Sequence, residues 1–272
     1  MKKRIFKVLT GAALFAVIIG CTMKNRGVAS ETESRAAKNT PAVSMDGTNT
    51  AEILPNDTSV VEIEVNDLPD NKYDDWFEIQ EINDSIFNRI KGVSFKSNCT
   101  VPREDLRYIT VAHYTLNGEV KKGELICHKL IADDMLDIFH NLYDARYPIE
   151  RMELVDNYDA DDRKSMSANN TSCFNFRLVA GSNHLSNHAL GLAIDLNPRY
   201  NPYVKKQKNG SLYVSPQNGT KYADRKADYP YKIDENDLAY KEFIAHGFNW
   251  GGHWKTMQDY QHFEKKIPGL KY

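Results

Sequence analysis

The chain has 272 residues, of which 41% are hydrophobic and 26% are charged, so it is long enough for one or two globular domains. The formal net charge of −2 and the pI of about 6.5 provide no basic excess, which argues against a nucleic-acid-binding protein. No internal repeat is visible.

The N-terminus has a basic start, an apolar run from Val8 to Ile19, and small Gly20 before Cys21. The run is too short for a comfortable membrane span and is typical of a secretory signal. Cysteine directly after the small residue resembles a bacterial lipoprotein cleavage box, although Ile19 is bulkier than usual. We expect residues 1–20 to be a signal peptide and Cys21 to be lipidated, with a plain signal peptide as the alternative. The protein would then be exported and anchored to a membrane of the bacterial cell envelope.

Residues 21–73 are rich in Ser, Thr, Asn and charge and show no sustained apolar period. This composition is typical of a disordered tether that holds a domain away from a membrane surface. We expect the ordered domain to span residues 74–272, with its core in residues 147–265.

Export permits disulfide bonds. If Cys21 is lipidated, three cysteines remain, Cys99, Cys127 and Cys173, so at most one pair forms. The sequence leaves open whether a pair forms or all three are free thiols. Because no C-x-x-C spacing occurs, a zinc site made of cysteines is not expected.

The first half of the domain shows helical and strand patterns in turn. Residues 74–92 predict a helix that ends at Gly92, because isoleucines recur at helical spacing. These isoleucines are Ile79, Ile82, Ile86 and Ile90. Residues 106–130 predict a β-hairpin with Asn117-Gly118 as its tight turn.

Residues 132–145 predict a second helix, which Asp133 would cap. Its apolar face consists of Met135, Ile138, Phe139 and Leu142. Residues 149–155 predict a strand, and a polar loop follows. Helices and hairpins mixed in one domain predict an α+β fold with a small antiparallel sheet and flanking helices.

The stretch SNHLSNHALGLAIDLN at residues 182–197 places an aspartate in an apolar run. From Leu192 onward the pattern alternates, so Leu192, Ile194 and Leu196 share one face and Ala193, Asp195 and Asn197 the other. We expect the apolar residues to face the core and Asp195 to face a cavity. Gly191 permits a sharp bend that lets His188 and Asp195 converge. A metal site, a hydrogen-bonded structural carboxylate and a polar turn are the three interpretations.

A converging histidine and aspartate need a third ligand to hold a catalytic zinc, which leaves the fourth position for water. The best candidate is His262, which lies in a short strand-like segment near the C-terminus. Glu264 would share its face and hold the imidazole. Asp259, in the turn before that strand, would act as the general base.

A lone histidine usually lies on the surface or forms a hydrogen bond in the core, and has no part in a metal site. We assign no function to His113, His128, His140 and His246. His184 and His188 would share a helix face, but the β-pattern after Gly191 argues against a helix there. His184 is therefore expected to contact the ligands or solvent. His253, between glycine and tryptophan, is the main rival ligand.

These residues resemble a known family. The pattern S-x-H-x-x-G-x-A-x-D at residues 186–195, followed by D-x-x-H at residues 259–262, is similar to that of the LAS-type zinc peptidases. That family includes D-alanyl-D-alanine carboxypeptidases and dipeptidases, L-alanyl-D-glutamate endopeptidases of phage lysins, and the hedgehog signalling domain. NTSCFNFR, NPRYNPYV and FNWGGHW look like the branch with vancomycin-resistance carboxypeptidases and lysin endopeptidases. The resemblance is strong from about Tyr147 to Phe263.

The resemblance implies a hedgehog-like zinc site with His188, Asp195 and His262 as ligands of one zinc ion and Asp259 as the catalytic base. Arg177 matches the arginine that stabilises the developing oxyanion or holds the substrate carbonyl, where a plain surface ion pair is the alternative.

Of the site residues Ser186, His253 and Asp259, the last two depart from the family pattern. Ser186 would bond to the backbone or the substrate rather than act as a nucleophile. His253 stands where relatives often carry an acid, and Asp259 replaces the glutamate of the carboxypeptidases, which leans towards the endopeptidase branch.

We therefore expect a monomeric, lipid-anchored zinc peptidase that cleaves peptidoglycan stem peptides, at D-Ala-D-Ala or at L-Ala-D-Glu. The alternatives are a non-catalytic zinc or cell-wall-binding lipoprotein module and an interaction lipoprotein without metal. The tyrosine-rich and partly basic residues 199–235 are typical of a solvated loop, or form a rim that receives an acidic stem peptide.

Overall fold

Residues 71–270 are described by a computed structural model of the protein. The predicted signal peptide, the predicted lipidation site Cys21 and the predicted tether up to residue 70 lie outside these residues. The described part opens with a 3-10 turn at Asn71–Trp76, slightly ahead of the predicted domain start. Within residues 71–270, no helix combines the length and the apolar character needed to cross a membrane.

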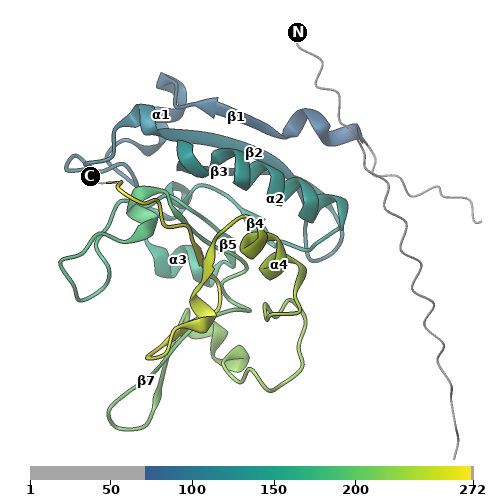
Figure 1. The fold of residues 1–272 in the computed structure, drawn as a ribbon, viewed down its shortest axis with the longest axis vertical. Helices are drawn as coiled ribbons and strands as arrows, with labels where there is room; N and C mark the ends of the chain where they lie inside the picture. Colours follow the sequence, from purple (N-terminus) through teal and green to yellow (C-terminus); the bar gives the residue numbers. More distant parts are fainter. Residues whose placement is uncertain (1–70, 271–272) are drawn as a thin grey trace, which may run out of the picture. The chain divides into compact units, whose positions relative to one another are not determined.

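Helices and strands are mixed along the chain (Figure 1). The α-helices of the described part are α1 (Asp84–Ile90), α2 (Ala132–Asp144), α3 (Asp162–Ser167) and α4 (Leu238–Ala245). The strands are β1 (Glu78–Glu81), β2 (Leu106–Tyr114), β3 (Val120–His128), β4 (Arg151–Met152), β5 (Asn170–Thr171), β6 (Ala193–Asp195), β7 (Tyr203–Lys206), β8 (Leu212–Ser215), β9 (Asn249–Trp250), β10 (Gln258–Asp259) and β11 (His262–Glu264). This mixture agrees with the predicted α+β class.

The strands of the described part form three small antiparallel sheets and one parallel pair. The antiparallel sheets have the orders β1-β2-β3, β6-β11-β9 and β10-β7-β8, and β4 pairs with β5 in parallel. The predicted hairpin is confirmed, because β2 and β3 pair along their whole length. Gly118 in its turn has a φ of 81°, which glycine adopts without strain.

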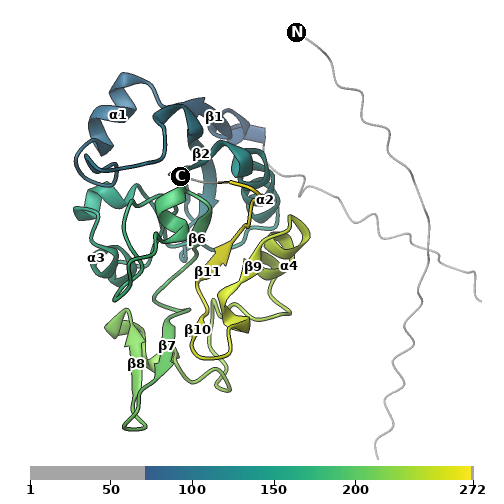
Figure 2. The same ribbon diagram turned by 60° about the vertical axis from the view of Figure 1, so that its left-hand side comes forward.

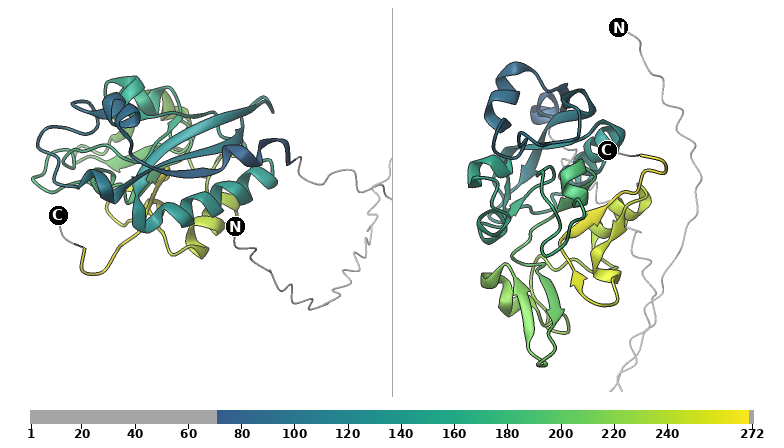
Figure 3. Two further views of the ribbon diagram at one scale, coloured as in Figure 1. Left: turned by 90° about the horizontal axis from the view of Figure 1, so that it is seen from above. Right: turned by 90° about the vertical axis from the view of Figure 1, so that its left-hand side faces the viewer.

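Helix α2 lies along the β2–β3 hairpin (Figures 1 and 3). Its predicted apolar face is buried in one cluster with the hairpin and consists of Met135, Ile138, Phe139 and Leu142. The same cluster contains Ile194 of β6 and Phe263 of β11. The ring of Phe263 also stacks on Phe243 of α4, with 4.4 Å between centroids. The main core thus directly supports the β6–β11 pair.

The predicted helix over residues 74–92 is wrong in its first half. Residues Glu78–Glu81 form strand β1, because this segment pairs along β2 and places Ile79 against the main core. Helix α1 begins only after Asn83, whose side chain accepts a hydrogen bond from the backbone N–H of Ile86 at 3.0 Å. The later isoleucines pack in a second cluster. Pairing with β2 therefore overrides the helical spacing.

Two smaller predictions also differ from the structure. Asp133 does not cap α2, since a 3-10 turn runs directly into the helix and Ile131 occupies the cap position without a side-chain hydrogen bond. The strand expected over residues 149–155 is reduced to the two residues of β4. It stops early because Val155 begins a 3-10 turn.

Candidate metal centre

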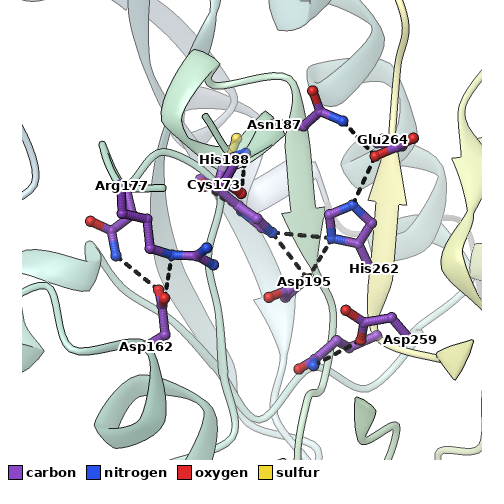
Figure 4. A network of polar contacts seen from close by, with 12 residues as sticks. Asp162, Cys173, Arg177, Asn187, His188, Asp195, Asp259, His262 and Glu264 are labelled. Atoms are coloured by element: carbon purple, nitrogen blue, oxygen red, sulfur yellow. Dashed lines mark hydrogen bonds and ion pairs between the residues drawn. The ribbon is translucent and has the colours of Figure 1, made fainter. Parts of the chain in front are cut away.

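Three side chains from two separate parts of the sequence converge in the structure. One ligand atom from each of His188, Asp195 and His262 lies within 4.8 Å of the others, and all three residues are buried (Figure 4). No other such group of histidine, cysteine or acidic side chains occurs within residues 71–270. The arrangement is a buried group of two imidazoles and one carboxylate, which could bind a metal ion.

The pairing of β6 with β11 brings Asp195 and His262 together. The two strands are antiparallel, and these two residues are direct partners in the register. Directly opposite residues in an antiparallel pair point to the same side of the sheet. Leu192, Ile194 and Leu196 are buried in the main core, as the alternation predicts. The opposite face of the strand is buried as well, with Asp195 only 8% exposed.

His188 reaches the same point from a 3-10 turn at Asn187–Leu190. Ser186 caps this turn, because its hydroxyl accepts a hydrogen bond from the backbone N–H of His188 at 3.3 Å. Gly191 ends the turn with a φ of 66°, and a Cβ there would lie 2.7 Å from the backbone N of His128. The predicted bend is therefore present, and only glycine fits it.

Each imidazole is held from behind by an acceptor. His188 Nδ1 donates to the carbonyl oxygen of Cys173 at 2.7 Å, which leaves Nε2 facing Asp195. His262 Nε2 donates to Glu264 Oε2 at 3.3 Å, which leaves Nδ1 facing Asp195. The facing nitrogens lie 3.2 Å apart and 3.3 Å and 3.1 Å from Asp195 Oδ1. Imidazoles fixed in this way are typical of metal ligands, and the donor set fits zinc.

The charges in the cluster favour a cation at its centre. Burial opposes the ionisation of Asp195, but the imidazoles of His188 and His262 outweigh it and hold its pKa far below the ordinary value. Burial lowers the pKa of His262, yet hydrogen bonds to Asp195 and Glu264 raise it to about 10. Either a proton on His262 or a metal ion provides this positive charge, and metal binding would displace the proton.

Asp259 lies at the end of β10, beside the three converging residues (Figure 4). Burial raises its pKa to about 6, and the negative charge of Asp195 adds to the rise. Gln261 Nε2 donates to Asp259 Oδ1 at 3.0 Å, so Oδ2 is left for another partner. Gly251 permits the close approach, since a Cβ there would lie 2.6 Å from the backbone oxygen of Asp259. A carboxyl group of this kind is suited to proton transfer.

Arg177 also lies beside the cluster (Figure 4). Its Nε forms an ion pair with Asp162, whose other oxygen accepts a hydrogen bond from Asn175 Nδ2 at 2.8 Å. No hydrogen bond of its two terminal nitrogens occurs within residues 71–270, and the contact with Asp162 is made by Nε. The arginine is therefore anchored through Nε while its outer donors stay available.

Two histidines considered from the sequence are not part of the cluster. His184 is exposed in a turn ahead of the site. His253 is a poor fit as the rival ligand, because its Nε2 bonds to Glu235 at 2.9 Å and its ring packs edge-on against Trp250. Glu264, by contrast, contacts His262 as expected.

Several residues that contact the cluster were not expected from the sequence. The Cys173 carbonyl is a backbone group, which residue type does not encode. Asn187 donates to Glu264 at 2.5 Å, and Gln261 orients Asp259. Asp162 anchors Arg177 from a helix fifteen positions earlier in the chain. Only Asn187 and Gln261 could have been suspected, because each adjoins a motif histidine.

The structure also settles the open question about the cysteines. Cys99, Cys127 and Cys173 are all free thiols. Burial raises the pKa of Cys127 and raises that of Cys173 well above the ordinary value. Buried thiols with raised pKa values are poor nucleophiles and poor metal ligands, so the cluster depends on histidine and aspartate.

Residues 180–265 match the family model of D-alanyl-D-alanine carboxypeptidase. This match supports the resemblance that the sequence motifs show to the zinc peptidase family. The matched segment contains the three converging residues together with Asp259 and Glu264, whereas Arg177 precedes it. No significant match was found among curated proteins or among solved structures.

Proposed function

We propose, from the match of residues 180–265 to the D-alanyl-D-alanine carboxypeptidase family, that this protein is a zinc-dependent peptidase that hydrolyses peptidoglycan stem peptides. The observation that carries the proposal is the buried convergence of His188, Asp195 and His262, with each imidazole oriented by a separate acceptor. These residues would hold one zinc ion per chain. When bound, zinc supplies Lewis-acid activation of the scissile carbonyl and of a water molecule.

Asp259 is the general base in this proposal. Its Oδ1 is occupied by Gln261, so Oδ2 takes the proton of the attacking water and later passes it to the leaving amine. A pKa of about 6, raised by burial and by Asp195, keeps the group ionised at neutral pH yet basic enough to accept that proton. Positioned proton transfer of this kind contributes roughly 100- to 10,000-fold to a rate.

Arg177 opposes the negative charge that develops on the carbonyl oxygen. The Asp162 ion pair holds the guanidinium at Nε, so the two terminal nitrogens, which make no hydrogen bond within residues 71–270, would meet the substrate. A surface ion pair alone would not explain why Asn175 also holds the Asp162 carboxylate.

The substrate and the location of the protein are part of the proposal. The family match and the cluster are compatible with cleavage at D-Ala-D-Ala or at L-Ala-D-Glu. The N-terminal motif supports export and lipidation at Cys21, which would place the peptidase at the envelope beside its substrate. The alternative is a non-catalytic zinc or wall-binding module, against which the paired presence of Asp259 and Arg177 argues.

The test combines metal analysis with the digestion of purified stem peptides by wild type and by the variant Asp259→Asn. We expect one zinc ion per chain in both proteins. The wild type should cleave the peptide, and the variant should cleave it at least roughly 100-fold more slowly. Bound zinc without any cleavage by the wild type would favour the binding module. Undiminished cleavage by the variant would refute Asp259 as the base.

A further inference from the structure

The β7–β8 hairpin lies beside the candidate site. It comes from the tyrosine-rich residues 199–235, and its strand β7 pairs with β10, which carries Asp259. Figure 2 shows the hairpin projecting at one end of the domain next to β10. Residues 203–215 of the segment predicted as a loop or a rim thus extend the sheet that holds the proposed base.

The register assigns the side chains of this sheet to its two faces. Asp259 is the direct partner of Tyr203, and Lys205 is the direct partner of Tyr213. Direct partners point to the same side, as do residues two apart in a strand. Asp259, Tyr203, Lys205 and Tyr213 therefore share one face, which we call the Asp259 face.

Contacts between the side chains agree with this assignment. The rings of Tyr203 and Tyr213 meet edge-on with 6.1 Å between centroids. Burial raises the pKa of Tyr203, and the charge of Asp259 adds to the rise, as expected for neighbours. On the opposite face, Val204 and Val214 are buried next to β10, whereas Lys206 and Leu212 are exposed towards the tip of the hairpin. Only the Asp259 face offers a surface that continues from the proposed catalytic group.

This surface combines exposed aromatic and cationic groups. Tyr213 is 48% exposed, and Lys205 is exposed. Lys205 has no hydrogen bond or ion pair within residues 71–270, and the hairpin from Tyr203 to Ser215 contains no acidic residue. Two tyrosine rings can pack against a bound peptide, and an unpaired lysine beside them can attract a carboxylate of that peptide.

We propose that Tyr203, Tyr213 and Lys205 form a subsite for an acidic peptide substrate whose free carboxylate lies roughly two or three residues from the scissile bond. The distance from the scissile bond to the carboxylate is taken from the distance between Asp259 and Lys205 in the sheet. Lys205 lies on the neighbouring strand, two residues beyond Tyr203, the direct partner of Asp259. With strands about 4.8 Å apart and about 3.3 Å per residue, this is about 8 Å. The inference rests on the proposed peptidase function and specifies its substrate.

The test uses the metal-loaded full-length protein and two synthetic stem peptides. One peptide carries the free carboxylates two or three residues from the scissile bond, and its analogue carries carboxamides there. The variant Lys205→Glu is compared with Lys206→Glu, which reverses the same charge on the other face of the same strand. Both lysines are exposed, so neither change is expected to disturb folding.

We expect Lys205→Glu to lower kcat/KM for the acidic peptide by roughly five- to tenfold, mainly through KM. Cleavage of the carboxamide analogue should stay unchanged, and Lys206→Glu should behave as wild type on both peptides. Equal losses in the two variants, or equal losses on the two peptides, would overturn the subsite.

Binding separates this inference from the proposed function. The dissociation constant of the acidic peptide is measured for the catalytically impaired Asp259→Asn protein, with and without each lysine change. If the wild type cleaves neither peptide, the peptidase proposal fails. Selective loss of acidic-peptide binding in Lys205→Glu would still support the subsite, and unchanged binding would overturn it.

Discussion

Replacing Glu264 by Gln should weaken zinc binding by about tenfold. The carboxylate of Glu264 accepts a hydrogen bond from His262 and so orients the imidazole with Nδ1 towards the proposed zinc site. Its Oε2 accepts hydrogen bonds from His262 Nε2 at 3.3 Å and from Asn187 Nδ2 at 2.5 Å. The residue is only 9% exposed, so solvent screens the charge weakly. A hydrogen bond to a charged group contributes about 1.5–3 kcal/mol and a neutral one about 0.5–1.5 kcal/mol. The difference of about 1–1.5 kcal/mol corresponds to about tenfold in affinity.

The assay is a competition for zinc between the protein and a chromophoric chelator at neutral pH. Asn187→Ala is the matched control, because it removes the second contact of Glu264 and leaves the carboxylate in place; its effect should be smaller. His262→Ala should abolish tight binding. If Glu264→Gln bound zinc as tightly as the wild type while His262→Ala lost zinc binding, the proposed role of the Glu264 carboxylate in orienting His262 would be refuted.

Three further predictions concern stability and proton transfer. Gly191→Ala should destabilise the fold by about 1–3 kcal/mol in urea unfolding, because of the φ of 66° and the close His128 backbone; an unchanged midpoint would contradict this. Burial raises the pKa of Asp237 from 3.8 to about 6, so the native state binds extra protons between these values and stability falls as pH rises through that window. Asp237→Asn should remove this slope and raise stability at neutral pH by about 1–2 kcal/mol, after discounting for partial exposure; an unaltered slope would exclude Asp237 as its source. Gln261→Leu removes a hydrogen bond that lowers the pKa of Asp259, so the acidic limb of the kcat/KM profile should move to higher pH, and an unmoved limb would argue against Asp259 as the base.

Local patterns predicted the parts of the site that depend on local geometry. The alternation from Leu192 to Asn197 predicted the strand that carries Asp195, and the core position of Ile194 agrees with it. Gly191 predicted the bend after His188, because a sharp turn requires a backbone conformation that glycine adopts freely. Both features depend on a few neighbouring residues, so the sequence contained the necessary information.

Long-range pairing accounts for what the sequence left undecided or misassigned. The register that places Asp195 opposite His262 depends on which strands meet, and no local pattern specifies it. The same applies to Ile79, whose helical spacing was overridden by pairing of β1 with β2. The backbone carbonyl of Cys173 is equally hidden, because any residue type could present it to His188.

The most direct test of the central claim is mass spectrometry of a purified stem peptide incubated with the protein before chelation, after chelation and after zinc is restored. We predict that a defined peptide fragment appears, that chelation stops its formation, and that zinc restores it, because His188, Asp195 and His262 form the proposed zinc site. Cleavage that continues after complete metal removal would contradict the account.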